Sequence, residues 1–262
     1  MFAMEMERTL FSKRFVFSVI GLALICILSM SDQIDVSIRW HEQREMFSSI
    51  QNIETLLMFD RCKTLLLIVL VILCCSGFIQ DLQHHYIRCI LSRASFRSYA
   101  CSKIAAVVIN CVCAVSMAFL LIALVLLPLM MIVVPPELTI DAEAYQSLAE
   151  GPFAPLYLIL MGANFGMAAS VLVLIGLWIS VWIPNLYIAA GSSVLVFYLL
   201  YAFSWWLPPF LDFDRLSSSV QVSILPPWIE LPYHLLFFSL LILLTGGGFY
   251  HSFRKKVLNG QI

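Results

Sequence analysis

The sequence predicts an all-α integral membrane protein with six transmembrane helices, both termini cytoplasmic and short extracellular helices. The first observation is composition: 61% of the residues are hydrophobic and 12% are charged, whereas soluble domains carry about 25% charged residues. The second is a set of apolar stretches free of Asp, Glu, Lys and Arg, at residues 15–30, 64–79, 104–134, 155–182, 186–207 and 231–250. Apolar runs of about 18 or more residues indicate membrane-spanning helices. We therefore expect one transmembrane domain, 1–262.

The basic residues predict the orientation of these helices. With six spans, ten of the fifteen Lys and Arg residues fall on the side that holds both termini and the segment between the second and third spans. The positive-inside rule makes that side cytoplasmic. Thirteen of the sixteen acidic residues fall on the other side, which agrees with this orientation.

The spans differ in length. The first two charge-free stretches have 16 residues each, short of the ~20 that cross a bilayer, so we expect flanking residues to extend them, with Arg61 and Lys63 snorkelling to the interface. The first is expected to be an uncleaved span rather than a signal peptide, because no good cleavage site follows it. The third is long enough to tilt or to project from the bilayer. Pro184 predicts a tight turn between the fourth and fifth.

Two external segments show helical patterns. Apolar residues recur at helical spacing at Met46, Phe47, Ile50, Ile53 and Leu57, which predicts an amphipathic helix that lies on the outer membrane face or on the protein. We expect a second short helix in the segment 141–149.

The cytoplasmic segment Gln80–Lys103 is the strongest candidate for a site. Arg93 and Arg97 lie four residues apart and would share one helix face, and Ser92 or Ser95 could cap a helix that runs into the third span. Two interpretations stay open: a basic loop that only obeys the positive-inside rule, or a helix that docks a cytoplasmic partner.

This segment resembles the first cytoplasmic loop of type-2 ABC exporter permeases. Those loops place an acid after the second span, a Ser-Arg element, an aromatic residue, and a Lys that opens the third span. The chain also resembles the family in its short turn Ile183-Pro184-Asn185 and in an N-terminal amphipathic segment, residues 4–14. It departs from the family at His84-His85, where a Gly-Thr pair is usual. The matching and neighbouring positions form the expected ATPase-docking loop: Asp81, His84, His85, Arg88, Ser92, Arg93, Arg97, Tyr99 and Lys103.

The resemblance implies the membrane subunit of an ATP-driven exporter in a bacterial plasma membrane. Two permease chains, identical or paralogous, would pair within the bilayer and dock ATPase subunits. No Walker motif occurs in the sequence, so ATP and Mg would be bound by the separate ATPase chain. The spans lack ionisable acids and cations, which favours an amphipathic or apolar cargo, such as an antimicrobial peptide or drug, over ion-coupled transport. A nucleic-acid partner is not expected.

Other polar residues offer weaker alternatives. Asn110 and Asn164 are the amides deep within spans and either pack between helices or face a substrate path. His234, together with Ser192 and Ser193, suggests an intramembrane Ser/His protease as an alternative function. A non-transporting membrane assembly factor is a further alternative. The cysteine spacing predicts neither a disulfide framework nor a metal site.

Overall fold

The computed structural model describes residues 2–39, 48–58, 60–92, 95–132, 146–149, 152–204, 206–219 and 227–259. Within them the regular structure is helical, apart from an isolated bridge between Ser48 and Met131. The elements are α1 (Phe2–Leu10), α2 (Lys13–Ser29), α3 (Ser31–Arg39), α4 (Ser49–Met58), α5 (Asp60–Gln83), α6 (Tyr86–Leu91), α7 (Phe96–Leu126), α8 (Gln146–Ala149), α9 (Ala154–Trp182), α10 (Leu186–Ser204), the 3₁₀ turn Pro209–Leu211, α11 (Phe213–Ser217) and α12 (Pro227–Leu258).

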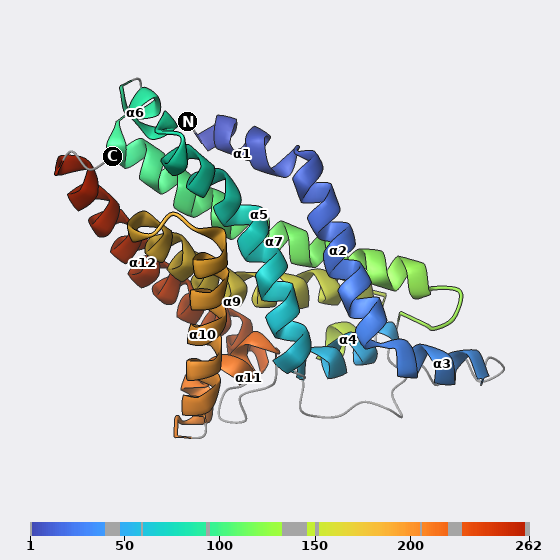
Figure 1. Cartoon of the computed structure of the whole chain (residues 1–262). Helices are drawn as coiled ribbons and strands as arrows, with labels where there is room; N and C mark the ends of the chain where they lie inside the picture. The colour runs from blue at the N-terminus through green and yellow to red at the C-terminus, as the bar shows by residue number, and fades with distance from the viewer. Residues whose placement is uncertain are drawn as a thin grey trace.

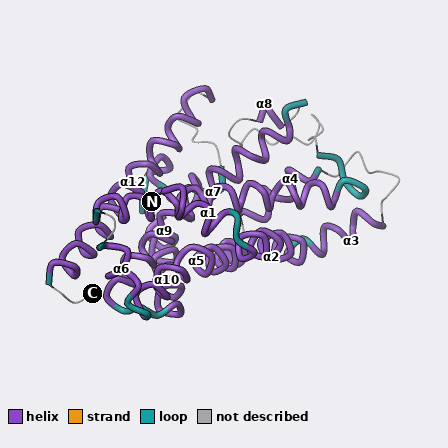
Figure 2. The backbone as a smooth tube through the Cα atoms, turned by 90° about the horizontal axis from the view of Figure 1, so that it is seen from above, coloured by secondary structure: helices purple, strands orange, loops and turns teal. Residues whose placement is uncertain are grey.

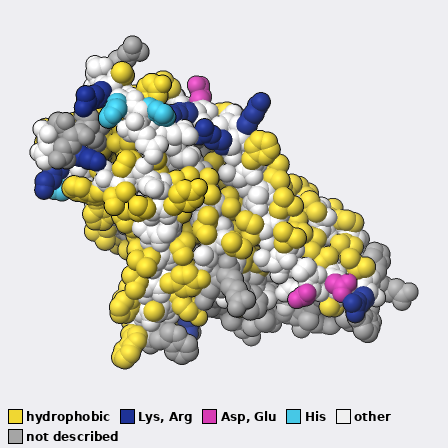
Figure 3. Space-filling view, viewed as in Figure 1, with side chains coloured by type: hydrophobic (Ala, Val, Ile, Leu, Met, Phe, Trp, Pro, Cys, Tyr) yellow, Lys and Arg dark blue, Asp and Glu magenta, His cyan; other side chains and the backbone are white. Residues whose placement is uncertain are grey.

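In the described part of the chain, five helices are long and apolar enough to cross a membrane: α5, α7, α9, α10 and α12. A sixth is added if α1 and α2, which meet at a bend of 53°, are counted as one span. Figure 3 shows a broad hydrophobic surface between one end where Lys, Arg and His gather and another where acidic residues appear. Soluble monomers rarely expose so large an apolar surface. Together with the long apolar helices, this surface indicates that the chain is a multi-pass membrane protein.

Helix α9 forms the centre of the bundle. It packs against α7, α12, α10 and α5, while α2 lies against α5 and α7 (Figures 1 and 2). Small residues let α9 approach α7 closely, because a Cβ at Gly162 would lie 2.7 Å from the Cα of Ser116 and one at Gly166 would lie 2.6 Å from the Cα of Val112. This Gly-x-x-x-Gly spacing is typical of helix packing in membranes, where dispersion contacts carry much of the association.

The bundle has two different ends, shown in Figure 1. One, here named the α6 end, holds α1, α6, the turn between α9 and α10 and the last turns of α12. The other, the α11 end, holds α3, α4 and α11. The first residues of α1 and the last residues of α12 thus lie at the same end of the molecule.

The helix bounds differ most from the hydropathy pattern at α7. The apolar stretch covers 104–134, but the helix runs from Phe96 to Leu126. It starts earlier because the side chain of Ser95 accepts a hydrogen bond from the backbone N–H of Ser98 and caps the helix. It ends earlier because Pro128 cannot continue a helical hydrogen-bond ladder. The expected turn at Pro184 is confirmed, with α9 ending at Trp182 and α10 beginning at Leu186.

The first amphipathic segment is helical, as expected. In α4 the side chains of Ile50, Ile53 and Leu57 are buried, while Met46 and Phe47 lie outside the described residues. The second expected helix is described only as the single turn α8, since residues 141–145 also lie outside. The snorkelling expected of Lys63 is wrong: its ammonium is buried, pairs with Asp214 of α11 and donates to Ser218 Oγ at 2.8 Å. The side chain of Arg61 lies outside the described residues.

Candidate functional site

The segment Gln80–Lys103 folds as the end of α5, the short helix α6 and the start of α7. The chain turns between α5 and α6 at His85, whose φ of 56° is in the left-handed region, a conformation in which histidine is enriched among non-glycine residues. Of the two expected caps, Ser95 caps α7, whereas the Ser92 hydroxyl donates to the Cys89 carbonyl at 2.9 Å. A short helix, α6, therefore lies between the two spans, and docking of a partner by this segment stays a prediction.

Three residues expected in the docking loop are buried instead of facing outward. Asp81 accepts two hydrogen bonds from the Arg8 guanidinium, each at 2.8 Å. The Lys103 ammonium donates to Glu5 Oε2, also at 2.8 Å. The Tyr99 ring is fully buried, and its hydroxyl has no hydrogen-bond partner among the described residues. These positions thus join helices within the chain.

The four charged residues, Glu5, Arg8, Asp81 and Lys103, form what we call the α1 ion-pair cluster. It ties α1 to both α5 and α7, the two helices that flank α6. The Glu5 and Lys103 side chains are 5% and 4% exposed, so each charge depends on its partner for compensation. In the second pair the Arg8 side chain is half-exposed, and its hydrogen bond to Asp81 raises the pKa of the guanidinium above its ordinary value, against the opposing effect of partial burial.

The remaining expected docking residues face outward. His84, His85, Arg88, Ser92 and Arg97 are exposed at the α6 end, where Figure 3 shows histidine and basic side chains together. Arg93 lies outside the described residues. The segment therefore divides into a buried set, in which Asp81 and Lys103 bind α1, and an exposed, mainly basic set that is free to contact a partner.

Aromatic packing fixes the base of this segment. Phe253 of α12 contacts Phe78 of α5, Phe96 and Tyr99 of α7, with ring centroids 5.1 to 5.9 Å apart. On the neighbouring side, Gln83 donates from Nε2 to the Pro184 carbonyl at 2.7 Å. These contacts join α5, α7, α12 and the α9–α10 turn at the α6 end.

Sequence reasoning missed Glu5, Arg8 and Phe253. Glu5 and Arg8 are three residues apart and so share a helix face, which was a usable signal that this face meets opposite charges. Phe253 lies past the last apolar stretch, and nothing in the sequence marks its contact with Phe96 and Tyr99.

The two span amides make different hydrogen bonds. Asn164 donates from Nδ2 to the Leu216 carbonyl at 2.6 Å and to Ser219 Oγ at 2.9 Å, and so anchors the α11 segment to α9. Asn110 donates to the carbonyl of Ala106 in its own helix at 2.7 Å, and its Oδ1 accepts no hydrogen bond within the described residues. A substrate path at these residues stays a prediction.

Of the two serines considered for proteolysis, Ser193 joins two helices and Ser192 bonds within its own helix. Ser193 Oγ lies 2.9 Å from the Leu172 carbonyl of α9 and 3.0 Å from the Ala189 carbonyl. Ser192 Oγ donates to the Ala189 carbonyl. A Cβ at Gly176 would lie 2.5 Å from Ser193 Oγ, so this serine sits in a tight α9–α10 contact. His234 belongs to another helix, α12, which also packs on α9, and the serine–histidine pair stays a prediction.

The described residues hold no group of three or more His, Cys, Asp or Glu side chains arranged to bind a metal ion. In comparisons of this chain with protein-family models, curated proteins and solved structures, nothing matched.

Proposed function

We propose that this chain is the membrane-spanning subunit of an ATP-driven ABC exporter that moves an amphipathic or apolar substrate out of a bacterial cell. In this proposal the six apolar helices α2, α5, α7, α9, α10 and α12 all span the plasma membrane. The α6 end, with both termini, faces the cytoplasm. ATP and Mg are bound by a separate ATPase chain, and a second copy or paralogue of this chain completes the transporter.

One observation carries the proposal: a short helix with an exposed arginine joins two membrane helices that are both bound to α1. Arg88 is the exposed cation of α6, and the exposed His84 and His85 immediately precede this helix. The α1 ion-pair cluster holds α5 and α7 against the same α1 helix. A partner that presses on α6 would therefore act on α5, α7 and α1 together. Because α2 follows α1 directly, a displacement would reach three membrane helices.

The substrate class follows from the interior of the bundle. Gly162 and Gly166 of α9 pack closely on α7. Two buried lysines are held in ion pairs at opposite ends of the bundle, Lys103 with Glu5 and Lys63 with Asp214. An ion-coupled transporter ordinarily retains ionisable groups within the membrane. A cargo that partitions into an apolar path fits this interior better.

The alternatives make different demands. An intramembrane protease would require a serine free to attack, whereas the hydroxyls of Ser192 and Ser193 are bonded to backbone carbonyls. A membrane assembly factor requires no ATPase at all, and the experiment below separates it from the exporter.

The test is affinity purification of the chain from its own host membranes in mild detergent, followed by identification of co-purified proteins. The proposal expects an ATPase with a Walker motif. The double variant Arg88→Glu/Arg97→Glu should lose it, since reversal of two exposed charges disrupts a complementary surface. The matched control is Arg39→Glu, an exposed arginine of α3 at the opposite end. Absence of any ATPase from the wild-type preparation, or equal retention by the double variant, would contradict the proposal.

A further inference from the structure

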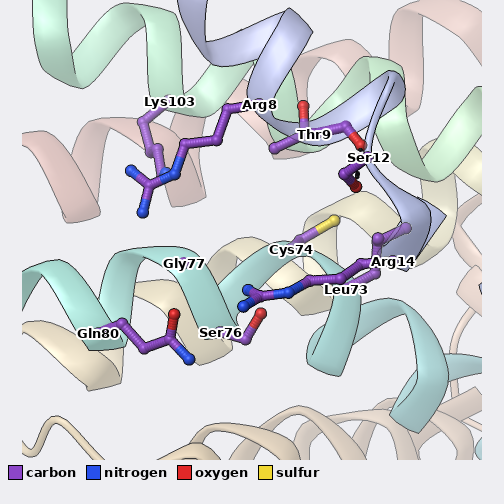
Figure 4. A pocket seen from close by; sticks show the side chains of 10 residues that line it. All are labelled: Arg8, Thr9, Ser12, Arg14, Leu73, Cys74, Ser76, Gly77, Gln80 and Lys103. Carbon is purple, nitrogen blue, oxygen red and sulfur yellow. Dashed lines mark hydrogen bonds between the residues drawn. The ribbon is translucent and has the colours of Figure 1, made fainter.

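A cavity of about 210 Å³ opens where α1 bends into α2, against α5 and α7. Its wall combines three cations and several hydroxyl and amide side chains with apolar surface from Leu73 and Cys74. The residues that line it are Arg8, Thr9, Ser12, Arg14, Leu73, Cys74, Ser76, Gly77, Gln80 and Lys103 (Figure 4).

The cavity carries one uncompensated positive charge. Arg8 and Lys103 are paired with Asp81 and Glu5, but Arg14 takes part in no ion pair among the described residues. In Figure 4 the Arg14 side chain extends from α2 toward α5. Arg14 is therefore a guanidinium available to bind an anion.

Neutral hydrogen-bonding groups stand beside this guanidinium. Ser76 and Gln80 lie one turn apart on α5 and line the same cavity. No hydrogen bond within the described part of the chain uses their side chains. An anion held by Arg14 could accept hydrogen bonds from both, and a guanidinium binds phosphate oxygens with two parallel N–H groups.

The position of the cavity indicates where that anion comes from. Arg14 immediately precedes the apolar part of α2, and the neighbouring side chains of Phe11 and Phe17 are 85% and 71% exposed. Phe side chains exposed next to Lys and Arg are typical of segments that bury an apolar face at the boundary between lipid headgroups and acyl chains. A lipid whose acyl chains lie along α2 would present its phosphate to this cavity.

We propose that this cavity binds the phosphate of an anionic phospholipid, with Arg14 as the principal contact and Ser76 and Gln80 as hydrogen-bond donors. A zwitterionic lipid offers the same phosphate but adds a cation, which the net positive charge of the cavity disfavours. The site is thus expected to prefer phosphatidylglycerol to phosphatidylcholine. The proposal does not depend on the exporter assignment.

The test compares lipid retention by the purified full chain, measured by native mass spectrometry after exposure to phosphatidylglycerol or phosphatidylcholine in detergent. Two variants remove the site by different means. Arg14→Gln removes the charge. Gly77→Leu fills the cavity, since a Cβ there would meet only Arg8 Nη2, at 3.9 Å. Lys13→Gln is the matched control, because Lys13 is an adjacent exposed cation that does not line the cavity.

The wild type and Lys13→Gln should retain phosphatidylglycerol in preference to phosphatidylcholine. Arg14→Gln should weaken this binding by about tenfold or more, as expected for loss of a charge-assisted hydrogen bond, and Gly77→Leu should weaken it comparably. Each variant is compared as the monodisperse, helical fraction, so that misfolded protein does not enter the measurement. Equal binding by Arg14→Gln and the wild type, or equal losses in Arg14→Gln and Lys13→Gln, would overturn the proposal.

A second arm identifies the source of the phosphate. Inorganic phosphate and glycerol phosphate are added as competitors of the retained lipid. Weak competition by both supports a lipid site, because the acyl chains then contribute to binding. Displacement of the lipid by free phosphate at equal concentration would overturn the lipid assignment.

Discussion

Replacing Lys103 by methionine tests whether the α1 ion-pair cluster holds α1 on the bundle. Methionine keeps the length and much of the volume of the lysine side chain but removes its charge. Glu5, 5% exposed in the wild type, then loses its only ion-pair partner among the described residues. Either the carboxylate stays buried without compensation, or α1 leaves α7 and returns it to water.

The magnitude follows from these two routes. Breaking a buried ion pair at one partner lowers the free energy of unfolding by about 3–5 kcal/mol. Undocking of α1 limits the loss, because α1 is a short helix of nine residues, and we expect a value near the lower end of that range. In contrast, Arg39→Met removes an exposed pair with Asp35 and should change the free energy by about 0.5 kcal/mol or less.

The assay is reversible unfolding of the purified chain in mixed detergent micelles, followed by circular dichroism, for Lys103→Met, Glu5→Gln and the double variant. Since the double variant leaves no unpaired charge, it should be more stable than the sum of the two single losses predicts, by about 1 kcal/mol or more. Additive losses, or a loss in Lys103→Met no greater than that in Arg39→Met, would refute the reasoning.

Three further predictions concern packing, orientation and the span amides. Gly166→Ala places a methyl group 2.6 Å from a Cα of α7 and should lower the free energy of unfolding by about 1–3 kcal/mol. Gly191→Ala is the control, because nothing lies within 4 Å of a Cβ there, and it should not lower the free energy of unfolding. Similar stabilities of the two variants would contradict the close α7–α9 contact. Cys89 and Cys101 are the exposed cysteines and lie at the α6 end. An impermeant maleimide should therefore label the chain in permeabilised cells but not in intact cells. Labelling in intact cells would show that the α6 end faces outward. Asn164→Ala leaves two α11 acceptors without their donor and should lower thermal stability by the equivalent of about 1–3 kcal/mol with transport per folded molecule unchanged; a selective loss of transport would instead place Asn164 on a substrate path.

The sequence was a good guide to the membrane helices because hydrocarbon admits few kinds of backbone structure. Stretches without charges must satisfy their hydrogen bonds internally, and helices do so. The helix bounds were less predictable, since helices continue past the apolar region wherever a cap allows it. Thus α7 begins at the Ser95 cap in the basic segment and stops before Pro128, and both signals are local ones that hydropathy does not weigh.

The sequence was a poor guide to which charged residues are exposed. In the sequence, Asp81 and Lys103 resemble surface residues of a basic loop. In the structure each is buried and paired with a residue of α1 that lies more than 70 residues away in the chain. Lys63 is buried in the same way by Asp214, 151 residues away. Such pairings depend on how helices assemble, and periodicity within one segment does not encode them.

The separation of buried from exposed charges determines how a partner surface at the α6 end should be tested. A charge reversal at Asp81 or Lys103 would break the α1 ion-pair cluster, so loss of a partner would not distinguish a missing contact from a displaced α1. Arg88 and Arg97 lie on the same segment, are exposed, and take part in no ion pair among the described residues. Reversal of their charges leaves the packing of α5, α7 and α1 in place, since surface substitutions away from such features change stability little. Loss of a partner from that variant therefore reports on the outward surface of α6 itself.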